Sequence, residues 1–80
     1  MPRSVPPPDH VVLRRRRIGD QIRAARLAKN LTQQAVAERA GGMDRATYVR
    51  IERGQASPLV DSLILIADAI GVPLSHLVRD

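Results

Sequence analysis

Two adjacent glycines, residues 41–42, divide the middle of this 80-residue chain into two short helical patterns. The first pattern runs over 33–40 and follows Thr32, a residue type that caps helix N-termini through its side-chain oxygen. The second runs over 45–53 and follows Asp44, which suits the same position. Glycine adopts the positive φ that ends a helix at little cost, so the pair predicts a tight turn between two helices.

Two short helices joined by a glycine turn are typical of a helix-turn-helix unit, whose second helix lies in the major groove of DNA. The other interpretation is a plain helical hairpin without a role in nucleic-acid binding. Arg45, Arg50 and Arg53 on the second helix favour DNA, as does a net charge of +5, which suits nucleic acid or an anionic membrane surface. The chain has a single aromatic residue, which argues against single-stranded targets because these usually need aromatic stacking.

Three further helices are predicted from the spacing of apolar residues, over 16–30, 58–70 and 74–78. Ser57 is the expected N-cap of the second of these, with Pro58 at its first position, where no N–H is needed. Four prolines fall among the first eight residues, so residues 1–13 are predicted to form a disordered proline-rich arm. The chain is therefore expected to be all-α, with one five-helix domain over 14–80.

Apolar side chains on one face of each predicted helix should form a small core of isoleucine, leucine, valine and alanine. On the first helix this face includes Leu27, and on the fourth it includes Val60. Tyr48 takes a core position on the third helix, where its hydroxyl needs a hydrogen-bond partner or a route to solvent. Leu65 falls opposite the core face and is expected to be exposed, as a residue that binds a partner would be.

The segments LTQQAVAERAG, IERGQASP and LILIADAIGVPLSHL resemble the Cro/repressor type of helix-turn-helix domain, the xenobiotic-response-element (XRE) family. The likeness covers about residues 17–78. It implies a repressor-like fold of five helices that binds double-stranded DNA through the second and third. It also implies transcriptional regulation by a homodimer, which suits a pseudo-palindromic operator. The turn in this chain is one residue longer than usual, which bears on the angle of the third helix.

The resemblance implies a set of base-contacting residues on the third helix. These are Arg45, Ala46 and Arg50, with Val49 beside them. The chemistry of these residue types agrees, because arginine can bond guanine O6 and N7 together and an apolar side chain can touch a thymine methyl.

The resemblance also implies contacts that position the protein. Gln33, at the start of the second helix, would contact a phosphate, and so would Gln55 and Ser57 in the loop after the third helix. Arg26 and Glu52 would form a structural ion pair between the first and third helices.

An unbroken basic run, Arg14, Arg15, Arg16 and Arg17, stands at the start of the first predicted helix. Positive charge at a helix N-terminus opposes the helix dipole. Two interpretations stay open: these side chains are solvated, or they contact DNA phosphates that offset the repulsion. Phosphate contacts would add affinity without sequence preference.

The last short helix carries Leu74, Leu77 and Val78, more apolar surface than its own core contact needs. These residues are predicted to form the homodimer interface. Two-fold symmetry would then place two recognition helices about 34 Å apart, matching a pseudo-palindromic site.

No enzyme activity, cofactor or metal site is expected. His10 and His76 lie far apart in a chain without cysteine, and the serines have no accompanying histidine and acid. No segment suits a signal peptide or a bilayer span, so a cytoplasmic protein is expected. The family resemblance adds the expectation of a bacterial or phage origin. The competing function is a protein-interaction module, such as an antitoxin or anti-repressor, whose main role is binding a partner protein.

Overall fold

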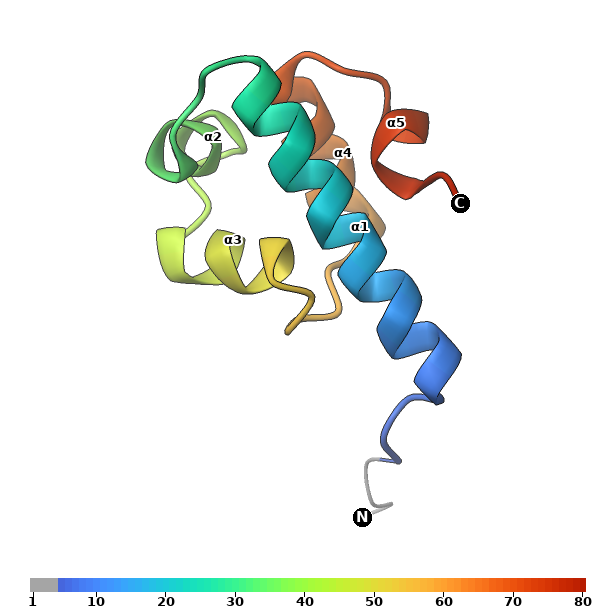
Figure 1. Ribbon diagram of the computed structural model, residues 1–80. Helices are drawn as coiled ribbons and strands as arrows, with labels where there is room; N and C mark the ends of the chain where they lie inside the picture. Colours follow the sequence, from blue (N-terminus) through green and yellow to red (C-terminus); the bar gives the residue numbers. More distant parts are fainter. Residues whose placement is uncertain (1–4) are drawn as a thin grey trace.

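The computed structural model describes residues 5–80, and within that range the chain forms five α-helices and no strand (Figure 1). The helices are α1 (Asp9–Ala28), α2 (Gln33–Arg39), α3 (Arg45–Glu52), α4 (Val60–Ile70) and α5 (Leu74–Val78). The predicted all-α, five-helix architecture is therefore confirmed.

The longest helix, α1, forms the spine of the domain. It packs against α3, α4 and α5, while α2 packs against α3 and α4. Figure 1 shows α2 and α3 together on one side of α1, with α5 on the other. The first turns of α1 project beyond the other helices (Figure 1). The helix-turn-helix pair is thus held at one side of the domain, with one of its surfaces left free.

Helix α1 begins earlier than the sequence predicted, at Asp9 rather than near Arg16. Pro8 occupies the N-cap position, and its carbonyl oxygen accepts the backbone N–H groups of Val11 and Val12 at 3.0 and 3.2 Å. A proline tolerates this position because helix formation does not require its missing N–H. The predicted arm over 1–13 therefore ends no later than residue 8, and its first four residues lie outside the described range.

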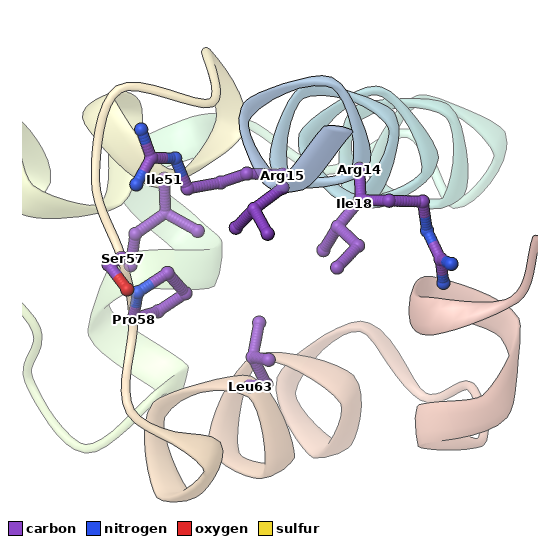
Figure 2. Close-up of a pocket in the computed structure, with 8 residues that line it drawn as sticks. Arg14, Arg15, Ile18, Ile51, Ser57, Pro58 and Leu63 are labelled. Atoms are coloured by element: carbon purple, nitrogen blue, oxygen red, sulfur yellow. The ribbon is translucent and has the colours of Figure 1, made fainter. Parts of the chain in front are cut away.

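The start of α4 was also predicted wrongly. The helix begins at Val60 with Leu59 at its N-cap, so Ser57 does not cap it and Pro58 is not its first residue. Ser57 and Pro58 instead line an apolar hollow between α1 and α4 (Figure 2). The chain thus enters α4 two residues later than the local sequence signals indicate. The other end of α4 is as predicted, at Gly71 with φ of +89°.

The core gathers residues from all five helices. Its fully buried side chains include Ile22, Val36, Tyr48, Ile66 and Leu77. Two predicted core residues lie at the surface instead: Leu27 is 47% exposed and Val60 is 64% exposed. Leu65 is 43% exposed, in agreement with its predicted outward position.

Candidate nucleic-acid interface

Helix α3 has two chemically distinct faces. Tyr48, Ile51 and Glu52 are buried and fix the helix against the core. The other face is open, and its residues line one concave surface together with the first residue of α2. This surface, called the α3 hollow below, is lined by Gln33, Arg45, Ala46, Val49, Arg50 and Arg53. All four residues predicted to contact bases therefore lie on one surface, beside the predicted phosphate contact Gln33.

The chemistry of the α3 hollow is suited to an anionic, hydrogen-bonding ligand. Three of its six lining residues are arginines and none carries a carboxylate. Guanidinium groups bind phosphates and the acceptor edge of guanine in a bidentate manner. Ala46 and Val49 add apolar surface of the kind that contacts a thymine methyl.

The turn before α3 uses both of its glycines. Gly41 has φ of +75° and Gly42 has φ of +73°, a region that side chains other than glycine rarely adopt. Thr32 caps α2, as predicted, by accepting the Ala35 N–H at 3.0 Å. Asp44 stands at the N-cap of α3, but its side chain makes no capping hydrogen bond. The entry to α3 is thus set by the glycine pair rather than by a side-chain cap.

Behind the α3 hollow, a buried ion pair joins α1 to α3. Arg26 donates from Nε and Nη2 to the two carboxylate oxygens of Glu52, each at 2.9 Å. The remaining Nη1 of Arg26 donates to the Leu31 carbonyl oxygen at 2.9 Å. Gln33 also approaches this pair, with its amide nitrogen 3.4 Å from Glu52 Oε1. The pair therefore links α1, α3 and the start of α2 at the back of the candidate interface.

Two glycines, which the sequence did not single out as contact points, allow α1 to come close to α3 and to the loop that follows α3. A Cβ on Gly19 would lie 2.9 Å from the Ile51 carbonyl oxygen and closer still to that of Glu52. A Cβ on Gly54 would lie 2.7 Å from Arg16 Cα. A glycine inside a helical pattern lowers helix stability, and a packing requirement is one reason to find it there, so Gly19 offered a clue.

The four arginines near the start of α1 have different surroundings. Arg14 pairs with Asp80 at 2.6 Å, and Arg15 Nε donates to the Gly54 carbonyl oxygen at 3.2 Å. Arg16 packs its backbone against Gly54 and has an exposed side chain, and Arg17 is exposed. The run is therefore not a uniform solvated face. The other predicted phosphate contacts, Gln55 and Ser57, are exposed in the loop that follows α3.

The predicted dimer surface on α5 needs correction. Leu77 is completely buried within its own chain, because α5 packs its inner face against α1 and α4. A side chain with no exposed area cannot reach a second copy in this conformation. Leu74 and Val78 are half-buried and keep part of their apolar surface accessible.

Tyr48 is fully buried beside the Arg26–Glu52 pair, and its hydroxyl makes no hydrogen bond within residues 5–80. Burial raises the pKa of this hydroxyl far above its usual range, and the Glu52 carboxylate adds to the effect. A buried hydroxyl without a partner costs free energy, so Tyr48→Phe should leave the free energy of unfolding unchanged or raise it by up to about 1 kcal/mol. Urea unfolding measures this. A loss of more than about 1 kcal/mol would mean that the hydroxyl does donate to Glu52.

Within residues 5–80, neither a metal site nor a membrane-spanning helix is found. In this part of the chain, no three histidine, cysteine or carboxylate side chains come together as a metal site would require. Among the helices of the same range, none has the length and apolar character needed to cross a membrane.

Comparisons with known proteins agree with one another. The helix-turn-helix family model HTH_3 matches residues 22–77. The cryptic phage CTXphi transcriptional repressor RstR of Vibrio cholerae is 35% identical over 60 residues, which cover 75% of this chain and 53% of that protein. The chain thus spans about half the length of this curated relative.

Solved structures with the same fold include proteins from two bacteria. The restriction-modification controller protein C.AhdI from Aeromonas hydrophila has a TM-score of 0.74 at 29% identity, covering 78% of this chain and 92% of that one. An HTH_3 family transcriptional regulator from Vibrio cholerae has a TM-score of 0.77 at 28% identity, covering 84% of this chain and 37% of that one.

Proposed function

This chain belongs to the XRE-type helix-turn-helix family, and from that premise we propose that it is a DNA-binding transcriptional regulator that reads duplex DNA with α3. The observation that supports this most is the α3 hollow, where three arginines and two apolar side chains share one open surface. The similarity of the chain to a phage repressor and to a controller protein agrees with the proposal. Such a regulator would work in the cytoplasm of a bacterial cell, where the DNA is.

Within this proposal, one set of residues contacts base edges and a second set contacts phosphates. Arg45 and Arg50 read base edges, with Ala46 and Val49 supplying apolar contacts. Gln33 contacts a phosphate, as do Gln55 and Ser57 in the loop after α3. Phosphate contacts fix the register of the protein on the duplex, whereas base contacts carry the sequence preference.

We propose further that the regulator binds a pseudo-palindromic operator as a homodimer. Two-fold symmetry would place the two copies of α3 about 34 Å apart, one helical turn of DNA. Leu74 and Val78 keep accessible apolar surface for a partner, whereas Leu77 belongs to the core. Sedimentation of the protein on its best duplex tests this, since one protomer per site at saturation would contradict it.

Reading of the DNA sequence by α3 can be tested with single substitutions. A selection from random duplexes supplies the best site, and fluorescence anisotropy measures binding to that site and to random DNA. Arg45→Ala and Arg50→Ala should each lose about 1–3 kcal/mol on the best site and relax the preference at one guanine per half-site. Gln33→Ala should weaken binding to all sequences alike, because a phosphate contact carries no sequence information.

Arg39→Ala provides a matched control, because it removes an exposed arginine from α2 that does not line the α3 hollow. It should retain the parent's sequence preference. If both α3 variants bound specific and random duplexes as the parent does, α3 would not be the reader. The alternative function, in which the protein masks a partner protein, would then be favoured, with the exposed Leu65 as a first residue to examine.

A further inference from the structure

Arg16 extends the positive charge of the α3 hollow onto α1. Its Cα and Cγ would lie 2.7 and 2.8 Å from a Cβ placed on Gly54. Gly54 directly follows Arg53, which lines the hollow, and the side chains of Arg16 and Arg53 are both exposed. The two arginines therefore stand on adjacent segments at the end of α3.

Arg23 continues this charge along α1. Seven residues make nearly two helical turns, so Arg23 lies about 20° around the helix from Arg16 and about 10 Å along its axis. Arg23 is exposed and precedes Arg26 by three residues. Arg26 pairs with Glu52, which also accepts a hydrogen bond from Gln33 in the lining of the hollow. Arg16 thus stands beside the segment that carries Arg53, and Arg23 stands about one turn of α1 before Arg26, whose partner Glu52 is bonded to Gln33.

The other arginines of the run do not share this position. Arg14 is paired with Asp80, and Arg15 is bonded to the Gly54 carbonyl oxygen. Arg17 precedes Gly19 by two residues, so it points about 160° away from the side of α1 that contacts α3.

One carboxylate, that of Asp20, lies between Arg16 and Arg23 in the sequence. Within residues 5–80 the salt bridges join Arg14 to Asp80 and Arg26 to Glu52, so Asp20 pairs with neither arginine. Both guanidinium groups are free to meet an anion.

From this arrangement we propose that Arg16 and Arg23 form a second basic surface, the α1 ridge, that contacts DNA phosphates alongside the α3 hollow. The ridge rests on the proposed DNA binding and extends it to a helix outside the helix-turn-helix pair. It adds affinity without sequence preference, because phosphates are the same at every base pair. Arg14, Arg15 and Arg17 take no part in it.

The test compares two double variants that remove the same charge from the same helix. Arg16→Gln/Arg23→Gln removes the α1 ridge, and Arg14→Gln/Arg17→Gln is the matched control. The probes are the best duplex from the selection and a random duplex of equal length, titrated over a range of salt. Thermal unfolding of both variants checks that the fold is retained.

Each phosphate contact contributes about 0.9 to the slope of log affinity against log salt, so loss of the ridge should reduce the slope by about 1.8. Over each tenfold increase in salt concentration, the ridge variant should therefore lose roughly 60-fold less affinity than the parent does. The reduction should be equal on both duplexes, and the control should keep the parent's slope.

Two results would overturn the α1 ridge while leaving the proposed function in place: an unchanged slope in the ridge variant, or an equal reduction in the control. The second of these would show that net charge, rather than the position of the arginines, sets the affinity. Absence of salt-dependent binding by the parent would overturn the ridge and the proposed function together.

Discussion

Glu52→Ala is expected to destabilise the fold by about 3–5 kcal/mol, because it would leave the Arg26 guanidinium buried without its carboxylate. Arg26 and Glu52 are 7% and 4% exposed, so water cannot readily replace the lost partner. Domains of this length have a total stability of about 4–12 kcal/mol, so the variant should be close to unfolding. Urea unfolding measures the loss.

Two comparisons distinguish the ion pair from a general effect of losing a carboxylate. Glu38→Ala removes an exposed carboxylate from α2 and should change stability by less than about 0.5 kcal/mol. A double-mutant cycle of Arg26→Ala and Glu52→Ala should show strong coupling, because each single change strands the other charge. A loss below about 0.5 kcal/mol for Glu52→Ala would describe an exposed, weak pair instead.

The same pair predicts how stability depends on pH. Burial tends to raise the pKa of Glu52. The hydrogen bonds that the carboxylate accepts from Arg26 and Gln33, together with the positive charge of Arg26, outweigh burial and hold this pKa below its usual value. A carboxyl group of this kind stabilises the fold above its unfolded pKa of about 4.3, and this stabilisation is lost as pH falls through the folded pKa. The parent should therefore lose more stability below about pH 4.3 than Glu52→Gln does. Equal losses would assign the acid sensitivity to other carboxyl groups.

Gly19→Val should cost about 3 kcal/mol, because the new side chain would collide with the backbone of α3. The atoms in its way are the carbonyl oxygens of Ile51 and Glu52, which cannot move without shifting the whole helix. If the new side chain pushed α1 away from α3, the Arg26–Glu52 pair would be strained as well. Thermal and urea unfolding both measure the effect.

Asp20→Val is the control for this prediction, because it places the same β-branched side chain at the next, exposed position of α1. It includes any effect of valine on helix formation, which is a few tenths of a kcal/mol to about 0.7 kcal/mol. If Gly19→Val lost no more stability than Asp20→Val, the close approach of α1 and α3 would have no energetic importance.

The sequence predicted best those features that depend on local chemistry. Thr32 caps α2 because its hydroxyl and the Ala35 N–H are neighbours along the chain. The turn at residues 41–42 follows from glycine alone, whatever packs nearby. The open face of α3 was visible as a helical pattern, since Tyr48 and Ile51 had to point inward and the residues between them outward.

Features that depend on distant segments were missed or misplaced. Helix α4 begins at Val60, after a loop whose Ser57 and Pro58 line a hollow together with residues of α1, and this arrangement joins segments far apart in the sequence. Leu77 looked surplus on a five-residue helix, but the surfaces of α1 and α4 enclose it. Gly19 and Gly54 matter through contacts across the domain, and their local sequence offered no more than one hint, the position of Gly19 inside a helical pattern. The predicted start of α1, near Arg16, was wrong for a local reason. Prolines before Asp9 do not prevent a helix from beginning there.

Because α3 has a buried face and an open face, its exposed residues can change while its packing against the core is kept. The side chains that hold the helix in place are separate from those that project into the hollow, although they alternate along eight residues. Exchanging Arg45, Ala46, Val49 or Arg50 leaves the contacts of Tyr48, Ile51 and Glu52 intact, and such surface changes usually alter stability by less than about 0.5 kcal/mol. Under the proposed reading of DNA by α3, duplicated copies of the gene could therefore acquire new target preferences by a few substitutions while keeping the same scaffold. Under the same proposal, exchanging the exposed residues of α3 between relatives would transfer sequence preference without disturbing the core.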